Sequence, residues 1–290
     1  MTSSFVATAW SLLRESLNEW LRHTDSRRGA ALAFYTVFSL APILIIAIAI
    51  AGLFFGEEAA RGEIVAQASG LIGPDGAHAV QALVENASRP GAGTKAAIIG
   101  VITLLIGATS ALAELKDDLD EIWEVPTEKI SGFWYFVRKR LLSFGLILAL
   151  CFLLLVSLVF SAILTALSKY WGTYDVSSTL LQSVNFAVGL LLVTALFAMI
   201  YKILPAEHIA WRDVTVGAAV TALLFSVGKL LIGVYLGNSA IASTYGAAGS
   251  VILVLMWVYY SAQIFLFGAE FTRVYAHRCG SRSGGKDVGP

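Results

Sequence analysis

The feature of this sequence that most constrains its fold is a series of six long apolar runs. They cover residues 30–55, 96–115, 141–167, 180–204, 214–236 and 247–271. A hydrocarbon core of about 30 Å needs roughly 20 apolar residues when it is crossed by an α-helix, so each run is long enough. Strands of a membrane barrel would be shorter and would alternate in polarity. The sequence therefore predicts an all-α, polytopic membrane bundle of six transmembrane helices.

Composition favours the same class. Of the 290 residues, 57% are hydrophobic and 14% are charged, whereas a soluble domain carries about 25% charged residues. A chain this apolar could not cover its own core with polar surface, so the bilayer is its natural solvent. The formal net charge is zero, and the total charge therefore indicates no acidic partner.

The distribution of Lys and Arg predicts the orientation. Fifteen of them fall on one side of the six runs and four on the other, with Lys229 inside a run. Positively charged loops stay in the cytoplasm. We therefore predict that both termini are cytoplasmic, which an even number of spans allows.

Three segments lie outside the spans of the membrane domain, which we assign to residues 29–275. Residues 1–28 predict an amphipathic helix, which either lies in the inner membrane interface or packs on the bundle. The external loop 57–95 contains two amphipathic pieces around the turn signal "GPDG", which predicts a helical hairpin. In the cytoplasmic loop 116–140, the second helix is expected to continue to Pro126 with its acidic residues on a solvated face. Residues 276–290 are predicted to be a disordered cytoplasmic tail.

Pro42 lies near the middle of the first span. Only 13 apolar residues follow it, and these would cover about 20 Å, so the helix must begin near Ala30. Proline cannot donate to the carbonyl of Phe38, which protein or water must then satisfy. Ser39 is close enough to help. Two interpretations stay open: a discontinuous helix at a substrate site, and a packed kink.

Lys229 is the one ionisable residue deep in a span. A charge there is expensive, which favours an interior or water-facing position, with snorkelling as the alternative. Together with Ser39, Pro42, Asn185 and Gln263 it forms our candidate intramembrane polar site. Glu270 is expected to make a salt bridge at the inner rim with Lys202, Arg140 or Arg212.

Close approach of the last two helices is expected at small residues. Gly233 and Gly237 form one GxxxG pattern, and a second group of small residues lies at 246–249. Such residues let membrane helices pack closely.

Motifs of common enzyme classes are missing from the sequence. It contains no HExxH, P-loop, GxSxG or zinc-type Cys/His spacing. We therefore predict no catalytic residues, no metal site and no cofactor, and we expect no nucleic-acid partner.

Three strings then carry a resemblance. "GAALAFYTVFSLAPILI", "ILPAEHIAWRDVTVGA" and "YGAAGSVILVLMWVYYSAQIFLFGAE", in this order, resemble the YihY/BrkB family of bacterial inner-membrane proteins. Some members once carried a ribonuclease BN label. The positions that match the family's motifs are Phe34, Tyr35, Ser39, Pro42, Leu204, Pro205, Trp211, Asp213, Gly217, Tyr245, Gly246, Trp257, Tyr259, Gly268 and Glu270.

The resemblance implies a multi-pass protein of the bacterial inner membrane but no settled activity. Our first hypothesis is a transporter or a lipid- or envelope-related protein that handles a small or amphiphilic substrate in the bilayer. The alternative is a membrane scaffold that binds envelope proteins, as a role in serum resistance and virulence would suggest. A ribonuclease is the least favoured, because no metal ligands and no basic single-strand groove are evident.

Overall fold

The computed structural model describes residues 2–87, 110–126, 178–237 and 247–283. Within these ranges all regular structure is helical and no strand occurs. The helices are α1 (Thr2–Arg22), α2 (Asp25–Phe55), α3 (Glu57–Ala87), α6 (Ser178–Ile203), α7 (Trp211–Gly237) and α9 (Ala247–Arg278). A further helical stretch covers 110–122. The predicted span 141–167 and most of the span 96–115 lie outside the described residues.

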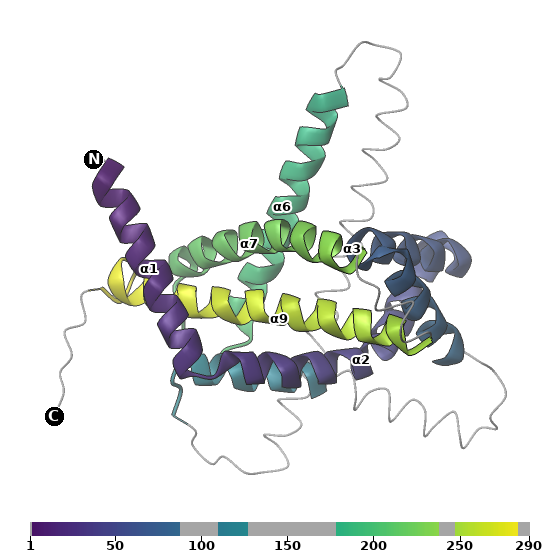
Figure 1. Ribbon diagram of the computed structural model, residues 1–290, viewed down its shortest axis with the longest axis horizontal. Helices are drawn as coiled ribbons and strands as arrows, with labels where there is room; N and C mark the ends of the chain where they lie inside the picture. The colour runs from purple at the N-terminus through teal and green to yellow at the C-terminus, as the bar shows by residue number, and fades with distance from the viewer. Residues whose placement is uncertain (1, 88–109, 127–177, 238–246, 284–290) are drawn as a thin grey trace.

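Helix α9 is the centre of the arrangement (Figure 1). It contacts α1, α2, α3 and α7, while α6 packs on α7. Helices α2, α7 and α9 lie side by side, and α1 crosses them at the end where α9 finishes. The start of α7 meets the end of α9, since Gly217 faces Thr272. Helices α7 and α9 are therefore antiparallel.

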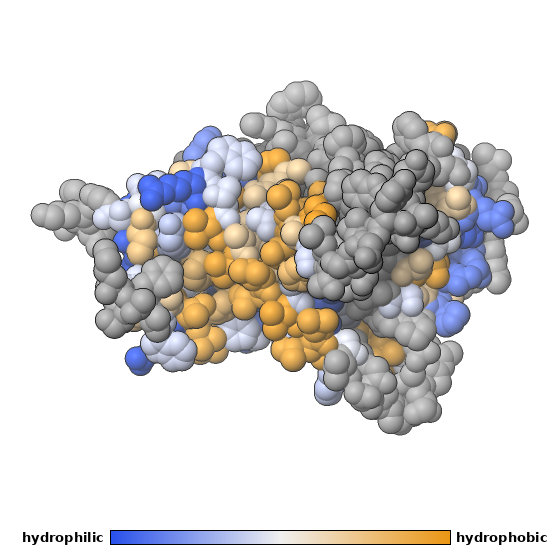
Figure 2. Space-filling model, turned by 90° about the horizontal axis from the view of Figure 1, so that it is seen from above, coloured by the Kyte–Doolittle hydropathy of each residue, from blue (hydrophilic) through white to orange (hydrophobic). Residues whose placement is uncertain are grey.

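Three of the described helices are long and apolar enough to cross a membrane. Their apolar segments are Phe186–Ile203, Trp211–Gly233 and Val251–Arg278, which match the fourth, fifth and sixth predicted spans. The first predicted span lies within α2. Figure 2 shows hydrophobic residues gathered across the middle of one face and hydrophilic residues toward two ends. This distribution suits a helix bundle whose middle is surrounded by lipid.

The largest apolar cluster joins α6, α7, α9 and the stretch 110–122. Tyr201 is almost fully buried in it, stacked on Phe197 and within 5.0 Å of the ring of Phe265. Its hydroxyl donates to the backbone carbonyl of Phe265 at 2.7 Å. A buried tyrosine needs such a partner, because an unpaired hydroxyl in an apolar core is costly.

Among the described residues, α7 and α9 approach closely at Gly217 and Gly268. A Cβ on Gly217 would lie 2.7 Å from the Cβ of Thr272, and one on Gly268 would lie 2.8 Å from the Cβ of Thr221. Each threonine hydroxyl donates to the carbonyl of the glycine on its own helix. The prediction is wrong for Gly233, because a Cβ there would meet no described atom within 4 Å. The packing around Gly237 and residue 246 lies outside the described part of the chain.

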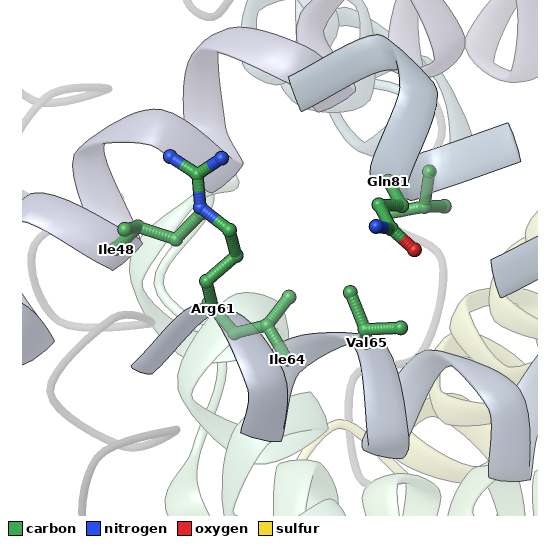
Figure 3. A pocket seen from close by; sticks show the side chains of 6 residues that line it. Ile48, Arg61, Ile64, Val65 and Gln81 are labelled. Carbon is green, nitrogen blue, oxygen red and sulfur yellow. The ribbon is translucent and has the colours of Figure 1, made fainter. Parts of the chain in front are cut away.

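Helix α3 was expected to be two pieces divided by a turn at residues 73–76, but its helical assignment runs unbroken from Glu57 to Ala87. Ile64 and Val65 nevertheless line one small pocket together with Val80 and Gln81 (Figure 3). Sixteen residues of straight helix would separate these positions by about 24 Å. The helix therefore bends back on itself between them, and its two halves face each other as the arms of a hairpin would.

The stretch 110–122 ends before Pro126, as predicted. One face of this stretch is buried, and its residues Leu119 and Ile122 are fully inaccessible to solvent. The expectation that its acidic residues form a solvated face is wrong for Asp118, whose side chain is 3% exposed. Asp120 also makes a tertiary contact, since its Oδ1 accepts a hydrogen bond from the backbone nitrogen of Ala206 at 2.7 Å.

Helix α1 packs on α9 through Leu12, which is buried against Phe271 and Val274. Another part of its apolar surface stays uncovered, since Trp10 is 69% exposed and Leu21 60%. Helix α1 is thus attached to the bundle and still offers an apolar surface to its surroundings.

Candidate functional site

A groove runs between α1, α7 and α9, and we call it the α1–α7–α9 groove. Its volume is about 320 Å³. Its lining residues are Leu17, Trp20, Leu224, Val227, Gly228, Leu231, Tyr260, Gln263, Ile264 and Phe267. Gly228 allows α7 to lie close to α9 along the groove. A Cβ on Gly228 would stand 2.5 Å from Cδ1 of Ile264 and 3.0 Å from the ring of Tyr260.

Two buried polar atoms belong to residues that line the groove. The indole Nε1 of Trp20 and the Oε1 of Gln263 have no hydrogen-bond partner within the described part of the chain. The amide nitrogen of Gln263 does have one: it donates to the carbonyl of Ser26 at 3.4 Å. Buried polar groups in proteins are nearly always paired. Two residues of this mainly apolar groove therefore each carry a buried polar atom without a partner among the described residues.

The described side chains of the predicted intramembrane site are not all gathered in this groove. Of the five predicted residues, Gln263 lines the groove. Lys229 is half-buried on α7 next to Gly228 but is not a lining residue. No carboxylate among the described residues lies within ion-pair distance of Lys229. Asn185 lies in α6, and its side chain is outside the described part.

The structure also bears on the proline in the first span. Helix α2 runs without interruption from Asp25 to Phe55 and so passes through Pro42, whose side chain is not described. Ser39 is fully buried, and its hydroxyl donates to the carbonyls of Tyr35 and Thr36 at 2.9 and 3.0 Å. These are not the carbonyl of Phe38 that proline leaves unpaired.

A second polar feature lies where α1 crosses the end of α9, and we call it the polar cluster. It consists of six carboxylates, three arginines and one histidine. Its members are Glu19, Arg22, His23, Asp25, Arg28, Asp118, Glu121, Glu124, Glu270 and Arg273. They come from α1, the turn after it, the start of α2, the segment 118–124 and α9.

At the centre of the polar cluster, Nδ1 of His23 lies 2.5 Å from Oε1 of Glu270. The side chain of His23 is 9% exposed and that of Glu270 is completely buried. The partners predicted for Glu270 from the sequence are Lys202, Arg140 and Arg212. Lys202 instead donates to the carbonyl of Ile209, and Arg140 lies outside the described residues.

Burial changes the titration of groups in the polar cluster that lie outside the apolar spans. Desolvation, helped by the nearby negative charge of Glu270, raises the pKa of Asp25 to about 7. Desolvation and the charge of Glu114 raise the pKa of Asp118 to about 6. Desolvation, followed by the positive charge of Arg22, lowers the pKa of His23. Burial thus favours the neutral forms of all three groups.

Sequence reasoning missed most of the polar cluster. His23 and Asp25 were included in the N-terminal segment without a role, because they are separated from Glu270 by more than 240 residues. One signal was available: His23 and Asp25 stand at the junction of two predicted helices, where polar side chains often satisfy helix ends.

Several family motif positions make defined structural contacts. Gly217 and Gly268 are sites of close helix approach. Asp213 is buried and accepts hydrogen bonds from the backbone nitrogen and the hydroxyl of Ser281, which fixes the chain after α9. The exposed ring of Trp211 lies under the ammonium of Lys202 at 5.7 Å.

The other motif positions are exposed or partly exposed aromatic residues, two buried residues, and two residues outside the described part of the chain. Phe34 is 54% exposed and Tyr35 is 38% exposed. Trp257 contacts Phe225 edge-on at 6.4 Å. Tyr245 and Gly246 are outside the described residues. Leu204 and Pro205 are buried, and Tyr259 is partly exposed.

Comparison with known proteins agrees with the resemblance of these motifs. The family model described as Virulence factor BrkB matches residues 16–288. A UPF0761 membrane protein of Pseudoalteromonas atlantica is 27% identical over 278 residues, which are 93% of this chain and 88% of the relative. One from Alteromonas mediterranea is 27% identical over 248 residues, covering 83% of this chain and 79% of the relative.

A third relative, a UPF0761 membrane protein of Yersinia pseudotuberculosis, is 27% identical over 192 residues and covers 66% of this chain and 63% of its own length. No solved structure matches the chain. The family model covers most of the sequence, and the apolar helices are those expected of a membrane protein. The chain therefore belongs to the BrkB family of membrane proteins.

Proposed function

We propose that the protein binds an amphiphile whose acyl chain lies in the α1–α7–α9 groove, and that it handles this molecule in the membrane by transport or in envelope assembly. The observation that carries the proposal is the groove with its two unused polar atoms. Its volume of about 320 Å³ is within the usual range for small-molecule sites, about 300–1,000 Å³.

The chemistry of the lining supports this class of ligand. Leu224, Val227 and Leu231 offer aliphatic surface along α7, which suits a hydrocarbon chain. The indole N–H of Trp20 can donate to an ester or phosphate oxygen. The amide oxygen of Gln263 can accept from a hydroxyl or amine. A molecule with a polar head and an apolar tail would satisfy both atoms, which a purely apolar ligand would leave unpaired.

The position of the groove supports a membrane lipid as the ligand. Leu223 and Leu230, which lie on α7 outside the groove, are 52% and 67% exposed. Exposed leucines on a membrane helix face acyl chains, so the groove would open onto the bilayer. The proposal contains no catalytic step.

Photo-crosslinking tests the proposal directly. We expect a phospholipid with a photoactivatable acyl chain to label groove residues of the purified protein in lipid nanodiscs, as mapped by mass spectrometry. Leu231→Trp should fill the groove and reduce this labelling several-fold. Leu230→Trp is the matched control, because Leu230 is adjacent, similarly exposed and not part of the groove.

Two results would count against the proposal. One is uniform labelling around the whole apolar surface, as ordinary surrounding lipid would produce. The other is equal labelling in Leu231→Trp and Leu230→Trp.

A further inference from the structure

We propose that Glu19, His23 and Glu270 bind a divalent transition-metal ion, of the class of Zn²⁺ or Mn²⁺, where α1 crosses α9. One ligand atom from each residue lies within 4.8 Å of the other two. Ligands about 2.0–2.2 Å from a tetrahedral metal ion stand about 3.3–3.6 Å from one another. To complete the site, Glu19 would move inward, and His23 and Glu270 would exchange their direct contact at 2.5 Å for contacts with the ion. This inference is independent of the proposed function.

The burial of Glu270 is the first reason to expect a ligand here. Its side chain is 0% exposed, and its Oε2 has no hydrogen-bond partner among the described residues. A buried carboxylate oxygen without a partner is costly, and more so when it is charged. A metal ion would satisfy this oxygen while His23 supplies a nitrogen ligand.

Asp25 is a second buried carboxylate without a hydrogen-bond partner among the described residues. It is fully buried, neither of its oxygens has a hydrogen-bond partner in the described part of the chain, and it is electrostatically coupled to Glu270 and His23. Its nearest cation is Arg28, whose Nε is 3.9 Å from Oδ1. Asp25 is therefore placed to balance the charge of an ion or to orient a ligand from outside the first coordination sphere.

The three arginines of the polar cluster are all engaged with carboxylates other than Glu270. Six carboxylates share three guanidinium groups. Arg28 is divided between Asp118 and Glu121 at 3.5 and 3.2 Å, while Arg22 and Arg273 both contact Glu19 and Glu124. Within the described chain, no arginine or lysine lies within ion-pair distance of Glu270. A divalent ion would supply positive charge next to Glu270.

The donor set points to the class of ion. Ca²⁺ and Mg²⁺ prefer sites made entirely of oxygen. One imidazole nitrogen with carboxylate oxygens suits Zn²⁺, Mn²⁺ or Fe²⁺. The ion would join two helices that are distant in sequence and so fix α1 against the end of α9.

Metal binding can be measured on the full chain in detergent. The protein is stripped with EDTA, incubated with one metal ion at a time and then dialysed. We expect it to retain one Zn²⁺ or Mn²⁺ per chain after dialysis, measured by elemental analysis, and not to retain Mg²⁺. His23→Gln and Glu270→Gln should each weaken binding at least about tenfold. His78→Gln is the matched control, because His78 is exposed on α3 and should leave binding unchanged.

A second measurement on the wild-type protein keeps the test decisive if a variant fails to fold. Co²⁺ added to the stripped protein should give a saturable visible spectrum of a site with one nitrogen and several oxygen ligands. Absence of retained metal and of a saturable Co²⁺ spectrum would overturn the proposal. Equal metal affinity in folded His23→Gln and wild-type protein would also overturn it.

Discussion

At the scale of a single residue, the burial of Asp118 makes stability depend on pH. Its pKa rises from 3.8 to about 6, chiefly by desolvation and the charge of Glu114. The folded protein therefore holds this proton more tightly than the unfolded chain. The stabilisation is full below about pH 4 and is lost as the pH rises through about 6, a change of about 3 kcal/mol.

Asp118→Asn should remove this contribution. We expect scanning fluorimetry of the detergent-solubilised variant to show a smaller loss of thermal stability between pH 4 and pH 6 than the wild type. The exposed carboxylate of Glu58 on α3 provides the control Glu58→Gln. An identical pH profile in Asp118→Asn and wild type would show that this carboxyl does not titrate as its burial requires.

A second residue-scale prediction concerns the hydroxyl of Tyr201. The side chain is 1% exposed, and its hydroxyl donates to the carbonyl of Phe265 across the α6–α9 boundary. Tyr201→Phe keeps the ring packing but leaves that carbonyl with one hydrogen bond fewer. We expect a loss of about 1–2 kcal/mol, measured as a lower midpoint in thermal or denaturant unfolding. An unchanged midpoint would show that this hydrogen bond does not contribute to stability.

At the scale of the helices, the contact of α7 with α9 depends on two glycines that face two threonines. A methyl group on Gly217 would meet the Cβ of Thr272 at 2.7 Å and its Cγ2 at 2.9 Å. Threonine is branched at Cβ and cannot rotate this bulk away, so the helices must move apart. Gly217→Ala should therefore destabilise the protein by about 1–3 kcal/mol.

Gly233 on the same helix is the control for this prediction. A Cβ there would meet no described atom within 4 Å, and alanine is the better helix former by about 1 kcal/mol. Gly233→Ala should leave thermal stability equal or slightly higher. If both variants melt at the same temperature, the close approach at Gly217 does not limit stability.

At the scale of the whole molecule, the charge distribution predicts cytoplasmic termini. Cys279 is exposed just after α9, and the chain has two cysteines, so Cys151→Ser leaves one reporter. A membrane-impermeant maleimide should label Cys279 in permeabilised spheroplasts but not in intact ones. Addition of His78→Cys on α3 should introduce labelling in intact spheroplasts, because α3 belongs to the predicted external loop. Labelling of Cys279 in intact spheroplasts would reverse the predicted orientation.

The sequence by itself determined the helical class, the membrane environment and the position of the last three spans. These properties are local, because a bilayer selects any run of about 20 apolar residues wherever it occurs in the chain. The family motifs were also readable without a structure. Leu119 and Ile122 are spaced as on one face of a helix, and both are buried.

Only the tertiary structure decided which residues meet. His23 and Glu270 are 247 residues apart, and their contact exists because α1 crosses the end of α9. The family motifs include Gly217 and Gly268 but do not show why these positions matter, because only the facing helix reveals a close approach. The burial of Asp118 was likewise set by segments distant in the chain. The physical reason is common to all of them: helix formation is encoded in neighbouring residues, whereas burial and pairing depend on which helix faces lie together.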